Sequence, residues 1–98
     1  MRDYLIFMHG DQERPEAVDD WETYVAALRE TGMFVGGSAF GPASSFRKNV
    51  SSVAGSPRVL TGYIRIRARD LADAQTCLVA NPVYEAGGTI EIYELIED

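Results

Sequence analysis

The sequence predicts a single α+β domain in which two helices cover one face of an antiparallel sheet. Its 98 residues suffice for one domain with a core of its own, and they are too few for two. Apolar residues make up 46% of the chain and charged residues 24%, a balance typical of folded rather than disordered proteins. Segments with strand and helix patterns follow one another in the order β-α-β-β-α-β, which is typical of the α+β class.

The first strand and the first helix are predicted from residue type and spacing. Residues 3–8 are aromatic or aliphatic after the leading Asp3, and they stop at a His-Gly-Asp turn. A helix is expected from about Pro15 to Thr31, because proline suits the first helical turn and Gly32 is a natural residue just past a helix end. An apolar stripe runs along this helix at spacings of three and four residues: Val18, Trp21, Val25 and Leu28.

Two further strands are expected in the middle of the chain. Residues 33–40 have strand character, and the pair Gly36-Gly37 inside them marks a bulge or a close approach of another backbone or a ligand. Residues 46–53 are expected to form an irregular hairpin arm between two turns. The clearest strand is predicted over residues 59–68, where isoleucines alternate with tyrosine and arginine.

The last two elements are a second helix and a closing strand. Asp70 is a good residue for the start of the helix, and Pro82 is expected to end it because proline cannot continue a helix. A last strand is predicted over residues 89–96, with Ile90 and Ile92 on one face. This order of elements predicts a ferredoxin-like α+β domain.

One face of the predicted sheet is not covered by the helices. The isoleucines of the last two strands would meet the helices, which leaves on the opposite face Tyr63, Arg65, Arg67, Glu91 and Tyr93. Such a face is too aromatic for ordinary water-facing surface and too charged for a core. We therefore expect a homodimer that forms through this open sheet face and contains a polar cavity.

Charge and amino-acid content exclude several classes of function. The formal net charge of −6 disfavours binding to nucleic acid or to an anionic membrane surface. No apolar run is long enough to span a bilayer, and no basic segment leads into an apolar one near the N-terminus, so a soluble cytoplasmic protein is expected. Cys77 and His9 are the only residues of their kinds, so we expect no internal disulfide, no metal site and no cofactor.

His9 and Asp11 are the candidate catalytic residues. Histidine titrates near neutrality, which suits general acid–base chemistry, and His9 lies where the first strand ends. In a chain that is still extended, Asp11 would point the same way and hold the imidazole in one tautomer. The alternative is a structural turn in which Asp11 bonds to local backbone.

Five other side chains are candidates for binding a small anionic or aromatic ligand: Ser38, Arg47, Tyr63, Arg65 and Tyr84. Residues 47–69 include basic side chains and no acid, and arginine binds carboxylates through a planar fork of donors. For Arg65 the alternative is an ion pair with Glu91 or with an acid of a partner subunit. Trp21 and Tyr24 are interpreted as packing residues, and Cys77 as an inert small apolar residue.

Short segments spread over most of the chain carry a family resemblance: Tyr4–Phe7, Trp21, Leu28–Gly32, Val35–Gly37, Thr61–Ile64, Ala68–Ala74, Asn81-Pro82 and Glu85–Ile92. Together they resemble the YCII-related proteins, whose wider group includes the DGPF-domain proteins. The resemblance implies one YCII-like domain over residues 1–98, with a ferredoxin-like subunit that dimerises through its sheet into an α/β barrel.

The same resemblance implies less about activity. A few YCII-like proteins resemble or are dehydrochlorinases of chlorinated hydroxyquinols, which use a His–Asp pair at a cleft. The histidine usual in their first helix has no counterpart in this chain, and the Asp-Gly-Pro-Phe motif is missing. The resemblance therefore assigns no catalytic residue.

Two classes of function follow from these residues. One is a cofactor-independent lyase or hydrolase acting on a small aromatic or acidic metabolite. In it His9 would be the base, Asp11 would orient it, and Arg47 or Arg65 would hold an anion. The alternative is a non-catalytic dimeric protein that binds a ligand or regulates through the same cleft.

Overall fold

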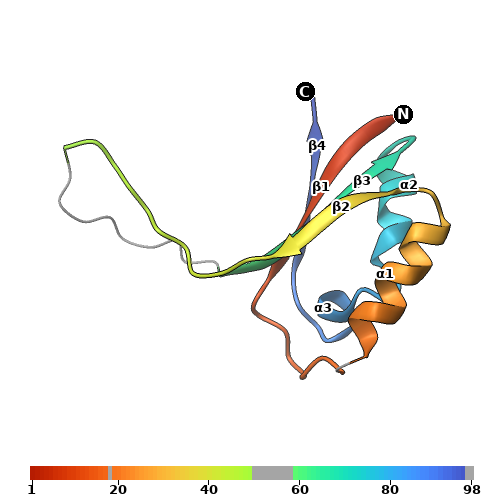
Figure 1. Cartoon of the computed structure of the whole chain (residues 1–98), viewed down its shortest axis with the longest axis horizontal. Helices are drawn as coiled ribbons and strands as arrows, with labels where there is room; N and C mark the ends of the chain where they lie inside the picture. The colour runs from red at the N-terminus through yellow and green to blue at the C-terminus, as the bar shows by residue number, and fades with distance from the viewer. Residues whose placement is uncertain (18, 50–58, 97–98) are drawn as a thin grey trace.

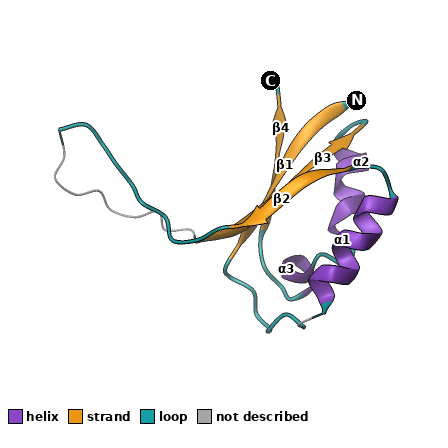
Figure 2. Ribbon diagram, viewed as in Figure 1, coloured by secondary structure: helices purple, strands orange, loops and turns teal. Residues whose placement is uncertain are grey.

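The computed structural model describes residues 1–17, 19–49 and 59–96. Four strands form one antiparallel sheet in the order β2-β3-β1-β4: β1 (Arg2–His9), β2 (Phe34–Ala39), β3 (Leu60–Ala68) and β4 (Ile90–Leu95). The helices lie together on one face of this sheet (Figures 1 and 2). The predicted α+β class and antiparallel sheet are confirmed.

The helical elements are shorter than the sequence predicts. They comprise α1 (Asp20–Glu30), α2 (Leu71–Gln75), a 3-10 turn η1 (Thr76–Leu78) and α3 (Pro82–Glu85). Residues 15–17 are not helical, so the expected start of the first helix at Pro15 is wrong. Glu16 instead accepts hydrogen bonds from the side chains of Trp21 and Gln12, which holds the chain outside the helix at this point. Val18 lies outside the described residues.

Pro82 begins a helix as well as following one. The Asn81 side-chain oxygen accepts hydrogen bonds from the backbone N–H groups of Val83, at 3.0 Å, and Tyr84, at 3.1 Å. Proline has no N–H to satisfy in the first helical turn, so the Asn-Pro pair is a good start for α3. The second helical region does end before Asn81, as predicted, but α3 was not expected.

The core lies between the sheet and the helices. Alternate residues of β1 enter it, as do alternate residues of β3 and two residues of α1: Tyr4, Ile6, Met8, Ile64, Ile66, Tyr24 and Leu28. Ile90 and Ile92 of β4 pack against this cluster while remaining partly buried. The predicted isoleucine alternation is therefore confirmed, since these side chains share the face that meets the helices.

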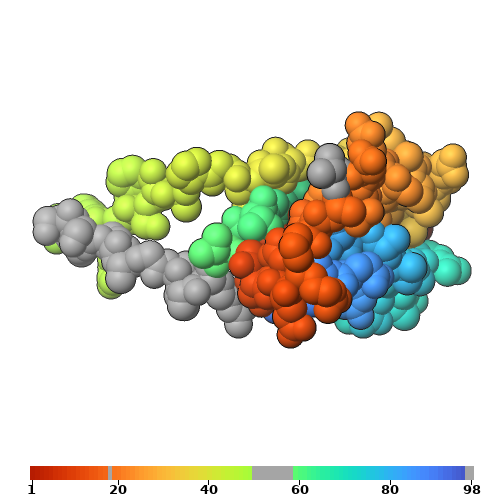
Figure 3. Space-filling model, turned by 90° about the horizontal axis from the view of Figure 1, so that it is seen from below, coloured from red at the N-terminus to blue at the C-terminus, as the bar shows by residue number. Residues whose placement is uncertain are grey.

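A long exposed segment leaves the sheet after β2. Residues 41–49 run away from the body of the molecule without forming a strand (Figures 1 and 3). The expected hairpin arm over residues 46–53 is absent from its first part, and residues 50–53 lie outside the described residues.

Within the described part of the chain, no helix is long and apolar enough to cross a membrane.

Candidate functional site

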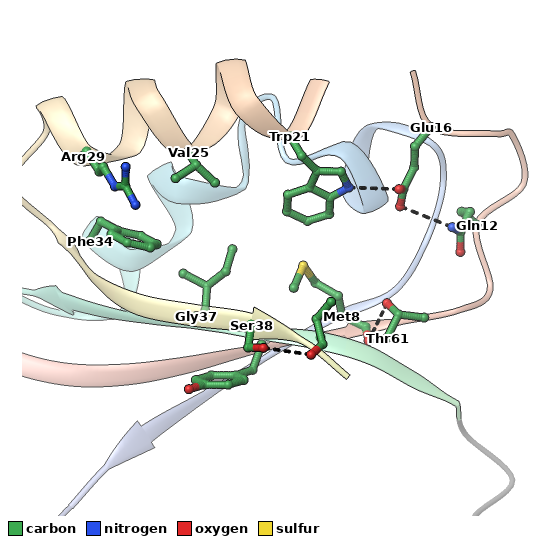
Figure 4. A pocket seen from close by; sticks show the side chains of 14 residues that line it. Met8, Gln12, Glu16, Trp21, Val25, Arg29, Phe34, Gly37, Ser38 and Thr61 are labelled. Atoms are coloured by element: carbon green, nitrogen blue, oxygen red, sulfur yellow. Dashed lines mark hydrogen bonds between the residues drawn. The ribbon is translucent and has the colours of Figure 1, made fainter. Parts of the chain in front are cut away.

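A cavity of about 530 Å³ opens between α1 and the sheet, and we call it the α1 cavity. Trp21 and Val25 extend from α1 toward the sheet, and Met8 on β1 lies across from them (Figure 4). Ile64 of β3 also lines the cavity. Most of the exposed lining is apolar. A concave apolar space with a few polar groups is typical of small-molecule sites.

Two glycines allow the strands to approach closely at the sheet side of this cavity. A Cβ atom at Gly37 would lie 2.7 Å from the backbone oxygen of Tyr63, and one at Gly62 would lie 2.9 Å from the backbone oxygen of Ser38. The pairing of β2 with β3 also shifts register between Phe34 and Gly36. The bulge or close approach predicted for the glycine pair is thus confirmed.

One end of the α1 cavity presents hydrogen-bond acceptors. The Trp21 indole donates to Glu16 Oε2 at 2.9 Å, and Gln12 Nε2 donates to Glu16 Oε1 at 3.3 Å. Gln12 Oε1 is buried and accepts no hydrogen bond from any residue that the structure describes. Because a carboxylate can only accept, the bond to Glu16 fixes which atom of the Gln12 amide is the nitrogen.

A cation lies at the other end of the α1 cavity. The Arg29 guanidinium is 5.3 Å from the centre of the Phe34 ring, over its face, which is a cation–π arrangement. Both residues line the cavity, and Arg29 is exposed at its edge (Figure 4). The cavity is therefore polar at two ends and apolar between them.

His9 belongs to a different group of side chains, on the side of the sheet away from the helices. Its Nε2 lies 2.5 Å from Glu91 Oε1, and Glu91 Oε2 accepts a hydrogen bond from the Tyr93 hydroxyl at 3.1 Å. Opposite an ionised carboxylate, neutral His9 carries its proton on Nε2, so the basic lone pair is on Nδ1. His9 is only 4% exposed and does not line the α1 cavity.

Asp11 bonds to Thr89 rather than to His9. Its two carboxylate oxygens accept from the Thr89 backbone N–H at 2.8 Å and the Thr89 hydroxyl at 2.5 Å. These hydrogen bonds lower the pKa of the Asp11 carboxyl. The expectation that Asp11 orients His9 is corrected, because the β1–β3 pairing shifts register between Met8 and His9 and the strand does not continue to Asp11.

Arg65 is held by an acid of its own subunit. It donates to Asp3 Oδ2 from Nε at 3.0 Å and from Nη2 at 2.6 Å, while Arg67 Nε donates to Asp3 Oδ1 at 2.9 Å. Hydrogen bonds from Arg67 and Arg65 lower the pKa of Asp3 to about 2. The structure thus brings Arg65 to Asp3, an ion pair that the sequence analysis did not anticipate.

The remaining predicted binding residues are dispersed. Ser38 and Tyr63 border the α1 cavity, although the Ser38 hydroxyl donates to the neighbouring carbonyl of Ala39 and the Tyr63 ring stacks on Phe40 on the open face. Arg47 lies in the exposed segment 41–49, and Tyr84 is exposed on α3. The seven predicted site residues therefore do not form one site.

Aromatic rings cross the open face from β4 to the end of β2. Phe7 packs against Tyr93 with ring centres 5.6 Å apart and against Phe40 at 6.5 Å. Phe40 in turn stacks on Tyr63 at 5.7 Å. Tyr93 remains 51% exposed and Phe40 40% exposed. This face combines aromatic surface with the charged groups predicted for it.

The residues that give the α1 cavity its polar ends were not predicted from the sequence. Gln12 and Glu16 are four residues apart, as are Val25 and Arg29, but such spacings are common on any helix or turn. Trp21 was interpreted as packing, and it does pack on Tyr24 at 5.9 Å, but it also lines the cavity. Cys77 is buried as expected, and burial raises its pKa to about 11.

Over residues 1–17, 19–49 and 59–96, no group of three or more His, Cys, Asp or Glu side chains is arranged to hold a metal ion. Comparison of the chain with protein-family models finds no match, and comparison with curated proteins finds none either.

Proposed function

We propose that this protein binds a small aromatic or apolar molecule in the α1 cavity. The observation that carries this proposal is the cavity itself, about 530 Å³ of mostly apolar space beneath α1. Pockets for small molecules commonly measure about 300–1,000 Å³ and combine apolar walls with a few polar groups. Trp21 and Phe34 supply aromatic walls, while Gln12, Glu16 and Arg29 supply the polar groups.

The proposal includes a homodimer of ferredoxin-like, YCII-related subunits that pair through the open face into an α/β barrel. The element order and the strand order β2-β3-β1-β4 support the ferredoxin-like class. The exposed rings of Phe40 and Tyr93 support pairing through this face, because aromatic residues are enriched in the cores of protein interfaces. The α1 cavity lies on the other side of the sheet, so pairing would leave it accessible.

Ligand binding can be measured through the single tryptophan of the chain. Trp21 lines the α1 cavity, so its fluorescence reports directly on an occupant. Titration with phenylethanol should change this fluorescence in a saturable way. Val25→Phe, which fills the cavity, should weaken binding by about tenfold or more, a loss of about 1.4 kcal/mol.

Ala26→Phe is the matched control, because Ala26 is exposed on the same helix and outside the cavity lining. It adds the same ring without filling the space. Equal affinities in Val25→Phe and in the parent protein would place the ligand elsewhere. Absence of any saturable change with small aromatic probes would overturn the proposal.

A second candidate is catalysis at His9, and the contact between His9 and Glu91 favours it. A carboxylate that holds one imidazole nitrogen leaves the other as a base and stabilises the imidazolium that forms, as in catalytic triads. The reaction would be a lyase or hydrolase step on a small aromatic or acidic metabolite, without a cofactor. The nearby rings of Phe7 and Tyr93 would supply an aromatic surface beside it.

This candidate is tested by screening small aromatic acids and phenols for turnover. His9→Asn should lower any turnover by about 10²–10⁴-fold, the usual effect of losing an acid–base group, and Glu91→Gln should lower it as well. Asp11→Asn is the control, because Asp11 bonds to Thr89. Turnover lost in Asp11→Asn and retained in Glu91→Gln would contradict the assignment of Glu91 as the partner of His9.

A further inference from the structure

We infer that the α1 cavity selects ligands that carry an ammonium group on an aromatic or apolar body. This inference rests on the proposed function, since it names the ligand class for the same cavity. The ammonium would lie at the end formed by Gln12, Glu16 and Trp21, and the apolar body would extend beneath α1 toward Val25.

At the Gln12–Glu16 end of the cavity, some hydrogen-bond acceptor positions are unused. Glu16 receives one bond on each oxygen, from Trp21 and from Gln12, whereas a carboxylate offers about four acceptor positions. Gln12 Oε1 is buried without a donor among the described residues. A buried acceptor left without a donor costs about 1–3 kcal/mol, so a ligand that donates here gains affinity by removing that penalty.

An ammonium group matches this arrangement better than other common polar groups. It has three donors and no acceptor, so every hydrogen bond that it makes at this end is a donation to an acceptor such as Glu16. A hydroxyl offers one donor, and a carboxylate offers none at neutral pH. The positive charge is also attracted by the Glu16 carboxylate, and a charge-assisted hydrogen bond is roughly twice as strong as a neutral one.

Arg29, the other charged group of the lining, is too far away to oppose the ammonium strongly. It follows Trp21 by eight residues on α1, which corresponds to about 12 Å along the helix axis. Its guanidinium lies over Phe34 at the exposed edge of the cavity, where water screens it. The cavity therefore has an acid at the Glu16 end and a cation at the opposite, exposed edge.

The experiment compares three probes that share a phenyl ring and differ in their polar group: phenethylamine, phenylethanol and phenylacetate. Each is titrated into the full chain at neutral pH while Trp21 fluorescence is followed. Phenethylamine should bind about tenfold more tightly than phenylethanol, and phenylacetate should bind most weakly. Glu16→Gln should abolish the preference for the amine, because it retains an acceptor for the Trp21 indole and removes the charge.

Two further variants make the test specific. Gln12→Met keeps the length of the side chain without its acceptor, so it should weaken phenethylamine binding, though less than Glu16→Gln does. Glu22→Gln removes the same charge from an exposed position of α1 outside the cavity lining, so it should retain the preference. A loss in Glu22→Gln equal to that in Glu16→Gln would overturn the inference, since the net charge alone would then explain it.

The outcomes separate the ligand class from the proposed function. Equal affinity for the three probes, with binding lost in Val25→Phe, would overturn the ammonium preference and leave the ligand-binding function intact. Tightest binding of phenylacetate, lost in Arg29→Gln, would also overturn it, because the rim arginine would then select the ligand. Failure of every probe to bind would overturn the inference and the proposed function together.

Discussion

At the scale of single residues, Asn81 is the clearest determinant of local structure. It is fully buried, and its one amide oxygen serves two backbone N–H groups at the start of α3. Its nitrogen also lies 3.7 Å from the sulfur of Met8 in the core. Asn81 therefore links a helix end to β1, a role that only a small side chain with both donor and acceptor can fill.

Asn81→Ala should destabilise the protein by about 2 kcal/mol, because it removes a helix cap and leaves buried N–H groups without an acceptor. Asp70 offers a matched comparison, since its carboxylate caps α2 by accepting from Asp73 N–H at 2.8 Å while remaining exposed. Asp70→Ala should cost about 1 kcal/mol, as water can replace its oxygen. Urea unfolding of both variants tests this, and a larger loss in Asp70→Ala would contradict it.

Asp3 should make the free energy of unfolding depend on pH in the acidic range. The pKa of its carboxyl is about 2 in the folded protein against an ordinary value of 3.8, because Arg67 and Arg65 stabilise the ionised form. A carboxyl whose pKa is lowered on folding stabilises the protein above its unfolded pKa. This contribution should decline as the pH falls from about 4 to about 2.

Unfolding free energies measured across this pH range test the role of Asp3. Asp3→Asn should reduce the slope of stability against pH in the range and lower stability near neutrality. Arg67→Gln should reduce the same slope in part, because Arg65 remains bonded to Asp3. An unchanged slope in Asp3→Asn would show that the folded pKa of this carboxyl is close to its ordinary value.

At the scale of elements, β2 illustrates how two adjacent glycines can have different roles. A Cβ atom at Gly37 would meet the Tyr63 backbone oxygen at 2.7 Å, whereas one at Gly36 would meet nothing within 4 Å. Gly37 therefore permits the close pairing of β2 with β3 at the α1 cavity, and Gly36 lies at the shift in register. The sequence alone makes the two positions look equivalent.

Gly37→Ala should destabilise the protein by about 1–3 kcal/mol, because backbone atoms must move apart to admit the methyl group. Gly36→Ala should change stability by less than about 1 kcal/mol and can raise it, since alanine restricts the unfolded chain. Thermal or urea unfolding distinguishes the two. Equal losses would mean that the spacing of β2 and β3 is set by something other than Gly37.

Elements with strong periodic patterns were predicted well, and helix starts that depend on particular side-chain hydrogen bonds were not. The alternation around Ile64 and Ile66 is a period of two that only a strand satisfies. The start of α3 was not predicted, because a proline is common both just after a helix and in the first turn of one. The start of α1 was misplaced because the Glu16 carboxylate accepts from the Trp21 indole five residues on, a side-chain hydrogen bond that the spacing of apolar residues does not reveal.

The candidate sites were harder to predict than the fold. Glu91 is 82 positions from His9 in the sequence, and strand pairing alone brings the two together. Gln12 is an ordinary polar residue in a loop, and its unpaired oxygen appears only when the surrounding residues are in place. A cavity is space that side chains fail to fill, so periodicity in the sequence carries little information about it.

At the scale of the whole molecule, the two sides of the sheet differ in what they can bind. Helices cover one side and leave the α1 cavity, while the other side carries exposed rings beside ion pairs. Stable interfaces commonly bury about 1,200–2,000 Å² in total, with aromatic residues near the centre. The open face is the surface on which we expect two copies to pair.

Tyr93→Asp should weaken dimerisation, because it would bury an unpaired charge in the interface. Tyr84→Asp is a matched control, since Tyr84 on α3 is 48% exposed against 51% for Tyr93 and belongs to the helical layer. Sedimentation velocity at tens of micromolar, where stable interfaces of this kind persist, should show a dimer for the parent chain and for Tyr84→Asp. A monomeric parent chain would contradict pairing through the open face.

The position of β1 also constrains the order of events during folding. β1 is an inner strand, yet its partners are β3, which begins at Leu60, and β4, which begins at Ile90. During synthesis β1 is made long before either of its partners, and it cannot be paired on both edges until β4 has been made. Its apolar residues remain available to wrong partners meanwhile, and closing such long loops slows folding. Folding of this domain should therefore be completed only once β4 is available, as one late cooperative event rather than from the N-terminus onward.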